Sequence, residues 1–210
     1  MKTRVITIDI QSVGPETISE IVQVLRRDGV IVYPTDTFYG LGGNCLSQKA
    51  LQKIFDVKRK PPSKGLPVLV SGLRMAEALV SECPPVFQAL ADRFWPGPLT
   101  LVLKAASHLP QELIGPKKTI GIRLPDIPWL QALIRETGVA LVATSANISG
   151  EKEIDSAEEA IRMFKGKVEC IVDGGRTPGG KPSTVMDLTE ERPVLIREGV
   201  IDNKKLGKFL

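Results

Sequence analysis

Short apolar runs alternate with amphipathic helical patterns along most of the chain, and this alternation limits the possible folds more than any other feature. The run GVIVYP at 29–34 is apolar and ends at a proline, which is typical of a buried strand. The segment before it, 15–28, places its apolar residues on one helical face, and Gly29 is suited to end that helix. Strands separated by helices predict an α/β or α+β protein with a mixed sheet.

The same patterns locate the remaining elements. Helices are expected at 47–57 with Ser47 as N-cap, near 73–80, at 85–94, at 127–137, and after Ser156. Strands are expected at 66–70, 100–104, 119–125, 139–145, 168–173, 183–188 and 194–197. The last strands are too close together for helical crossovers, so some of them must pair antiparallel. Since no repeat or linker interrupts the pattern, we expect a single domain over residues 1–210.

Composition excludes several classes of protein. Hydrophobic residues make up 42% and charged residues 25%, which is ordinary for a globular chain and excludes disorder. No apolar run approaches the roughly 20 residues of a membrane span, and the start MKTRVITIDI lacks the features of a signal peptide. The three cysteines are widely spaced, which argues against disulfides or a zinc site. We therefore expect a cytoplasmic protein with no membrane partner, whose net charge of +4 permits an anionic ligand.

The turn after the first buried strand, at 34–43, carries Thr35, Asp36 and Thr37 and then three close glycines. Glycines let backbone N–H groups approach a ligand, and open α/β sheets bind ligands at strand ends. The alternative is a glycine-rich turn in which the threonine and aspartate side chains cap their own backbone. This segment alone does not decide between a ligand floor and a self-capped turn.

Two further loops carry polar chemistry. The basic loop at 58–65, KRKPPSKG, is stiffened by prolines and suits a polyphosphate. The alternative is that its cations only interact favourably with the negative end of the dipole of the preceding helix. The segment ATSANISG at 143–150 ends a strand with several hydrogen-bonding side chains, which could equally cap a turn.

Some common catalytic motifs are excluded. The segment 175–181 matches the first part of a P-loop, but Pro182 stands where a hydroxyl is required and a strand pattern follows instead of a helix. His108 lies in a polar stretch flanked by proline and is predicted to be a surface residue rather than a catalytic base. Chemistry through a nucleophilic triad or a tightly bound zinc ion is therefore not expected, and no metal-ligating residue is assigned.

Taken together and in order, PTDTFYGLG, the basic loop, GIRLP, TSANISG, STVMDL and LIREG strongly resemble the YrdC-like family, over about residues 10–200. The resemblance implies the YrdC-like fold in its short, single-domain form: a twisted, mixed open sheet flanked by helices, with a large basic concave cavity. It also implies synthesis of L-threonylcarbamoyl-AMP from L-threonine, bicarbonate and ATP with Mg²⁺, and release of pyrophosphate. The product would serve threonylcarbamoyladenosine modification of tRNA.

The resemblance also implies site residues. Lys58, Lys60, Ser145 and Asn147 form the catalytic signature. Thr37, Arg123, Ala143 and Ser183 fall at positions that bind L-threonine. Lys60, Lys64, Thr119, Ser145 and Arg197 fall at positions that bind the nucleotide. Arg123 is chemically suited to pair with the threonine carboxylate, and the lysines with Arg197 are suited to a triphosphate.

The sequence departs from the family pattern at several positions. Lys60 replaces an arginine, Glu153 replaces a small polar residue near the nucleotide, Leu69 replaces a residue that can be polar, and GKPST is an unusual form around Ser183. One alternative is therefore a non-catalytic relative that binds double-stranded RNA, tRNA or a nucleotide. A carbamoyl-transfer module of hydrogenase maturation is a third, disfavoured reading. Even for a synthase, weak binding of tRNA or double-stranded RNA and contacts with proteins of the tRNA-modification pathway are expected.

Overall fold

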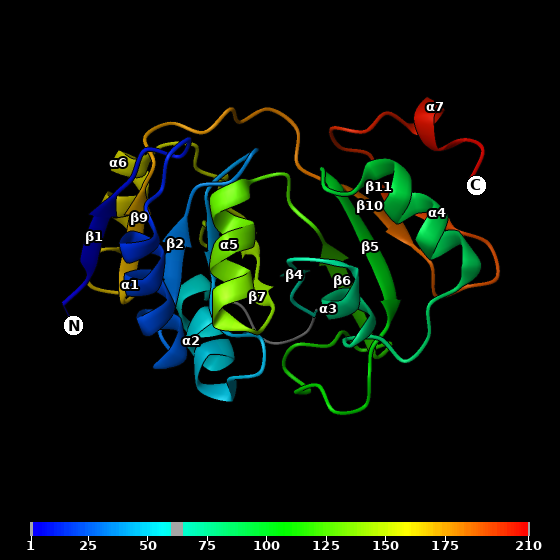
Figure 1. The fold of residues 1–210 in the computed structure, drawn as a ribbon, viewed down its shortest axis with the longest axis horizontal. Helices are drawn as coiled ribbons and strands as arrows, with labels where there is room; N and C mark the ends of the chain where they lie inside the picture. Colours follow the sequence, from blue (N-terminus) through cyan, green and yellow to red (C-terminus); the bar gives the residue numbers. More distant parts are fainter. Residues whose placement is uncertain (1, 60–64, 210) are drawn as a thin grey trace.

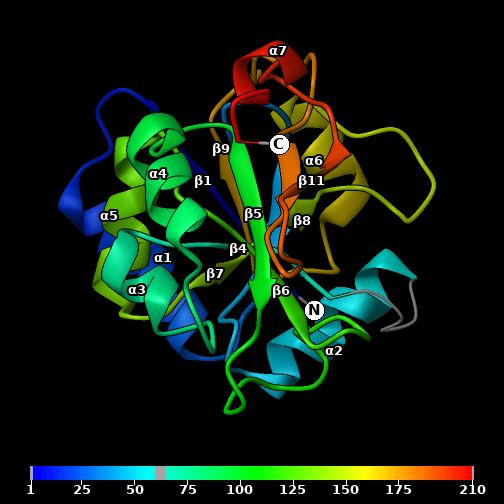
Figure 2. The same cartoon turned by 90° about the vertical axis from the view of Figure 1, so that its right-hand side faces the viewer.

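The computed structural model describes residues 2–59 and 65–209, whose strands form two mixed sheets (Figure 1). The five-stranded first sheet has the order β1-β9-β2-β3-β8, and the six-stranded second sheet has the order β11-β10-β5-β6-β4-β7. The mixed α/β class expected from the alternation is confirmed, and its strands are divided between two sheets instead of forming one. Helices α1, α3, α4 and α5 lie on one side of the strands and α2 and α6 on the other (Figure 2).

The first sheet is built around strand β2. Its strands are β1 (Arg4–Thr7), β9 (Cys170–Asp173), β2 (Ile31–Tyr33), β3 (Gly40–Gly42) and β8 (Thr144–Ser145). Ile31 and Tyr33 pack in the cluster formed with α1 (Pro15–Arg26) and α5 (Pro128–Thr137). Val32 packs in the cluster with α2 (Gln48–Lys58) and α6 (Ala157–Phe164). Successive side chains of a strand point to opposite faces, so β2 is buried on both sides, as its apolar run predicts.

The second sheet carries the later strands. They are β11 (Val194–Arg197), β10 (Thr184–Asp187), β5 (Leu99–Lys104), β6 (Thr119–Arg123), β4 (Val68–Leu69) and β7 (Leu141–Val142). Helices α3 (Leu73–Glu77) and α4 (Pro85–Phe94) follow β4, and α7 (Asn203–Leu206) lies near the C-terminus. Strands β10 and β11 pair antiparallel, which confirms the prediction made from their short connection.

The two sheets meet at Ala143. We expected one strand over 139–145, and this was wrong: β7 pairs with β4 in the second sheet, while β8 pairs with β3 in the first. The residue between them, Ala143, donates its backbone N–H to Pro67 O at 2.8 Å. The chain therefore passes from one sheet to the other within a single residue.

Strand β3 was not expected, because its sequence is GLG. Its glycines allow a close approach to the neighbouring strands. A Cβ atom on Gly42 would lie 1.8 Å from Val142 O, and one on Gly40 would lie 2.8 Å from the Tyr33 ring. Contacts below 3.0 Å do not occur for real Cβ atoms. Both glycines thus have a packing role, whereas the sequence had suggested ligand approach.

Three local signals at helix ends are confirmed, but the prediction that Gly29 ends the first helix was wrong, because α1 ends at Arg26 and Asp28 takes the left-handed conformation with φ of 59°. Ser47 accepts the Ala50 N–H at 3.1 Å, and Ser156 accepts the Glu159 N–H at 3.3 Å, so both serines are the predicted N-caps. Gly138 ends α5 in the left-handed conformation, with φ of 77°. Among the helices of the described residues, none has the length and apolarity required to cross a bilayer.

Candidate functional site

Residues of both sheets line a cavity of about 880 Å³. This volume lies in the upper part of the range of roughly 300–1,000 Å³ found for small-molecule sites. Apart from Lys58 and Asn147, every predicted site residue in the described part of the chain lines it: Thr37, Thr119, Arg123, Ala143, Ser145, Ser183 and Arg197. The predicted Lys60 and Lys64 lie outside the described residues, but Gly65, which follows them, lines the cavity.

Arg123 connects the second sheet, which carries it, to the turn that follows β2 in the first sheet. It lies at the end of β6, and its side chain is only 9% exposed. Its Nε–H donates to Gly97 O at 2.8 Å, and an Nη2 hydrogen is donated to Oδ2 of Asp36, in the turn after β2. A guanidinium has five N–H donors, so this side chain retains donors for a carboxylate at the position where the resemblance places threonine.

The turn 34–39 both caps itself and faces the cavity. Thr35 donates its hydroxyl to Phe38 O at 2.5 Å and accepts the Thr37 N–H at 3.1 Å. Asp36 and Thr37 line the cavity beside it. The two interpretations left open by the sequence are therefore compatible, because Thr35 fixes the turn that presents its neighbours to the cavity.

The segment 175–181, which matches the first part of a P-loop, holds the turn 34–39 through two hydrogen bonds. The Gly179 N–H donates to Thr37 O at 2.7 Å, and the Gly175 carbonyl accepts the Tyr39 hydroxyl at 2.8 Å. Strand β10, and no helix, follows this segment. Its exclusion as a phosphate-binding loop is confirmed by this context.

Three polar side chains of the second sheet also line the cavity: Thr100 in β5, Ser183 just before β10, and Arg197 at the end of β11. Thr100 and Ser183 share a hydrogen bond of 3.0 Å between their hydroxyls. Arg197 donates from Nη2 to Ser183 O at 2.9 Å and to its Oγ at 3.2 Å. Sequence reasoning missed Thr100, although it is the one polar residue of LTLVLK before the terminal lysine and could have indicated a side chain directed at a site.

Lys58 and Asn147 lie behind the cavity lining. The Lys58 side chain donates from Nζ to Ser145 O at 2.6 Å, to Asn147 O at 3.0 Å and to Asn147 Oδ1 at 2.9 Å. Asn147 Oδ1 also accepts the Ser145 hydroxyl at 2.8 Å, and its Nδ2 donates to Glu151 O. Both residues are buried. This geometry supports a positioning role for Lys58 and Asn147, and it leaves Ser145 as the described member of the predicted catalytic set that lines the cavity.

The charges on the described lining are balanced. Lys117, Arg123 and Arg197 are opposed by three carboxylates, those of Asp36, Glu153 and Asp187. The basic character expected of the cavity depends on the segment that contains Lys60 and Lys64, and it stays a prediction. No group of three or more His, Cys, Asp or Glu side chains that could hold a metal occurs within residues 2–59 and 65–209.

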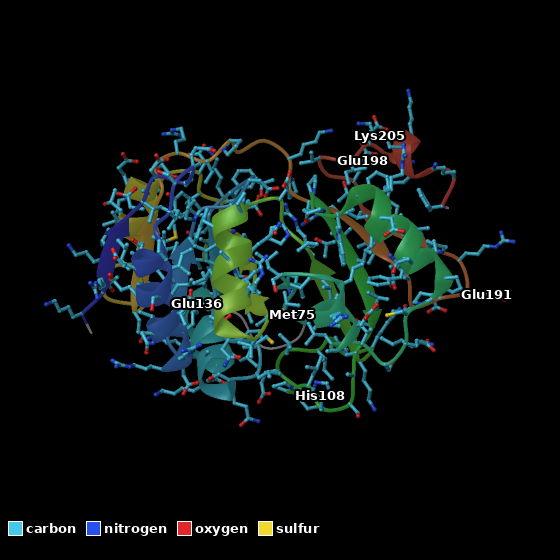
Figure 3. The ribbon with its side chains drawn as sticks, in the orientation of Figure 1. Met75, His108, Glu136, Glu191, Glu198 and Lys205 are labelled. Carbon is cyan, nitrogen blue, oxygen red and sulfur yellow. The ribbon has the colours of Figure 1, made fainter. Side chains whose placement is uncertain are left out.

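The tyrosines near the cavity are neutral and structural. Tyr33 lines the cavity, but its hydroxyl donates to Val142 O at 3.1 Å, and burial raises its pKa well above the ordinary range. Burial also raises the pKa of Tyr39 to about 12, despite a hydrogen bond from Gly174 that lowers it. His108 is exposed on a loop at the periphery, as predicted, and does not line the cavity (Figure 3).

Comparisons with known proteins give a consistent result. The model of the Sua5/yciO/yrdC family, described as "Telomere recombination", matches residues 23–199. The threonylcarbamoyl-AMP synthase of Pyrococcus abyssi is 39% identical over 186 residues, which are 89% of this chain and 55% of that protein. The chain therefore spans little more than half the length of this curated relative.

Two solved structures have similar folds. The crystal structure of P. abyssi Sua5 complexed with L-threonine superposes with a TM-score of 0.94 at 36% identity, covering 99% of this chain and 61% of that one. The crystal structure of E. coli YciO superposes with a TM-score of 0.87 at 31% identity, covering 100% of both chains. The first is a protein in complex with an amino acid, and the second is similar over its entire length.

Proposed function

The chain belongs to the Sua5/YciO/YrdC family, and on that premise we propose that it is an enzyme that makes threonylcarbamoyl-AMP from L-threonine, bicarbonate and ATP. The observation that carries this proposal is the shared lining of one cavity. Residues assigned from the resemblance to threonine and to nucleotide come from separate segments, and those in the described part meet around the same space. A scattered set of structural residues would not converge in this way.

The reaction is balanced without an enzyme nucleophile. The neutral amine of threonine attacks the carbon of bicarbonate, and one amine proton leaves with the hydroxyl group as water. An oxygen of the resulting N-carboxylate attacks the α-phosphorus of ATP, and the bond to pyrophosphate breaks. Such a reaction is accelerated chiefly by positioning and by electrostatic stabilisation of the phosphoryl group, which agrees with the absence of a triad motif from the sequence.

The cavity lining offers two kinds of chemical groups for these substrates. Near Arg123 and Thr37, the pair of Arg123 with Asp36 suits a small zwitterion. The hydroxyls of Ser145 and Thr119 and the cation of Arg197 suit a nucleotide, and we propose that Lys60 and Lys64 add positive charge for it. Mg²⁺ is proposed as the counter-ion of the triphosphate; no described residue is assigned as its ligand.

The product is an activated acyl group, so a second reaction must consume it. We propose that it supplies threonylcarbamoyladenosine modification of tRNA, through proteins of that pathway. Direct binding of tRNA or double-stranded RNA to this chain is expected to be weak and to fall steeply with salt, because it would depend on phosphate contacts. An RNA affinity that is high and insensitive to ATP would favour the non-catalytic RNA-binding alternative.

The test is pyrophosphate release measured with ATP while threonine and bicarbonate are omitted in turn and other amino acids replace threonine. Release is expected only with all three substrates and is expected to be greatest with threonine. Mass spectrometry should detect threonylcarbamoyl-AMP in the same mixture. A folded sample that binds ATP but releases no pyrophosphate, or releases it regardless of threonine, would contradict the proposal.

A further inference from the structure

The Asp36 carboxylate is only partly used by the protein. In the described part of the chain it accepts one hydrogen bond, from Arg123 to Oδ2, and the buried Oδ1 atom has no partner. A carboxylate can accept about four hydrogen bonds. Leaving a charged acceptor short of donors inside a protein is costly, so such a group calls for an explanation.

The neighbouring guanidinium is partly used as well. Arg123 donates to Gly97 O and to Asp36, which are two of its five N–H groups. Both side chains line the cavity, and that of Asp36 is 26% exposed. Since Oδ1 itself is buried, the ion pair presents the exposed part of the Asp36 side chain directly beside the remaining donors of Arg123.

This combination selects one chemical class of ligand. A phosphate would be attracted by Arg123 but repelled by Asp36, and the described cations Arg197 and Lys117 are better placed for phosphates because no comparable ion pair neutralises them. An α-amino acid carries a carboxylate and an amine on the same carbon atom. Its two groups match the donors of Arg123 and the acceptors of Asp36.

We propose that Asp36 binds the α-amine of the amino-acid substrate whose α-carboxylate, as the family resemblance implies, pairs with Arg123. This inference rests on the proposed function and adds the residue that recognises the reacting nitrogen. A neutral amine that donates one N–H to Asp36 keeps its lone pair for the carbon of bicarbonate. After water is lost, the N-carboxylate still has that one N–H, so the same contact holds the intermediate for attack on ATP.

The test compares two ligands that differ only in the amine. Isothermal titration calorimetry measures L-threonine and (R)-3-hydroxybutyrate, which is threonine without its α-amine, on the wild-type protein and on Asp36→Asn. The wild type is expected to prefer threonine roughly ten- to hundredfold, the range for one hydrogen bond to a charged group. In Asp36→Asn the preference should fall to within about threefold.

Controls separate recognition from structure. Glu153→Gln removes another cavity carboxylate, one that forms no ion pair with Arg123, and should keep the preference for threonine. Asp36→Glu, which keeps the carboxylate, should show part of the preference that Asp36→Asn loses. Thermal unfolding checks that each variant folds. A purely structural Asp36 would weaken both ligands equally, and an unchanged ratio in Asp36→Asn would overturn the inference.

If Asp36→Asn does not fold, the two ligands measured on the wild-type protein alone still test the role of Asp36. Equal affinity of the wild type for the two ligands overturns the role of Asp36 while leaving threonine as a ligand. Failure of the wild type to bind threonine, with ATP present or absent, overturns the proposed function and this inference with it. The two failures are therefore distinguishable.

Discussion

Replacing Lys58 by methionine tests whether this buried cation positions the loop that carries Ser145. Methionine has a similar length and is apolar, so the helix packing is retained while every Nζ hydrogen bond is lost. The carbonyls of Ser145 and Asn147 and the Asn147 amide oxygen would each lose this donor. An unsatisfied buried acceptor costs about 1–3 kcal/mol.

The total cost of these three unsatisfied acceptors is reduced, because Asn147 Oδ1 keeps its hydrogen bond from the Ser145 hydroxyl and because the loop can relax toward water. We therefore expect Lys58→Met to lower the free energy of unfolding by about 3 kcal/mol. With a urea m-value of about 2 kcal/mol/M, the unfolding midpoint falls by about 1.5 M. Pyrophosphate release should fall as well, because Ser145 would no longer be held at the cavity.

The measurement is urea unfolding followed by circular dichroism, with Lys49→Met as the matched control. Lys49 lies on the same helix and is exposed, so its replacement should change stability by no more than about 0.5 kcal/mol. A Lys58→Met protein within 1 kcal/mol of the wild type refutes the structural reasoning. If such a protein had also lost activity, Lys58 would be catalytic, as the sequence resemblance implies.

Three further predictions follow from the packing, the cavity and the buried thiols. Gly42→Ala should destabilise the protein by at least about 3 kcal/mol, measured by urea unfolding, because its Cβ would lie 1.8 Å from Val142 O in the tightly packed strand. Lys117→Ala should raise the Kd for ATP several-fold in calorimetry, whereas Lys118→Ala, outside the cavity lining, should not. Burial raises the pKa of Cys45 from 9.0 to about 12, so its contribution to stability is complete below pH 9 and is lost between pH 9 and 12, at about 1.4 kcal/mol per pH unit.

Each of these has a result that would contradict it. A Gly42→Ala protein as stable as Gly14→Ala, where a Cβ meets nothing within 4 Å, would show that the strand can move away. If Lys117→Ala and Lys118→Ala changed the Kd for ATP equally, Lys117 would act only as a general surface charge and not as a ligand of ATP. For the thiol, the Cys45→Ala variant should lose its share of the alkaline slope in urea unfolding at pH 8 and pH 10, and an unchanged slope would exclude Cys45 as the cause.

Much of the fold could be predicted because its signals are local. The periodicity of α1 and α5, the serine N-caps at 47 and 156, and the apolar run of β2 each reflect interactions within a few residues. The division into two sheets could not be predicted in this way. The strand pattern at 139–145 is uninterrupted, with an apolar run at 139–143, and the choice of strand partner depends on tertiary contacts that no local pattern encodes.

For the site, too, the sequence predicted residues within motifs but not the contacts between distant segments. Residues such as Arg123 and Ser183 could be assigned through motifs, and the structure brings both to the cavity. The partnership of Arg123 with Asp36 joins positions 87 residues apart, so spacing along the chain could not reveal it. Lys58 was expected among catalytic residues because the family resemblance implies it. Its burial could not be predicted, since a lysine is seldom fully buried and its sequence context gives no sign that it is.

The passage from β7 to β8 restricts how this region can change in length during evolution. Val142 pairs with Val68 on one side, Thr144 pairs with Leu41 on the other, and one residue separates them. An inserted or deleted residue would shift one of these two-residue strands by a position and turn its side chains to the opposite face. Length differences among relatives should therefore fall in exposed turns such as 189–193 between β10 and β11, while 141–145 keeps a constant length.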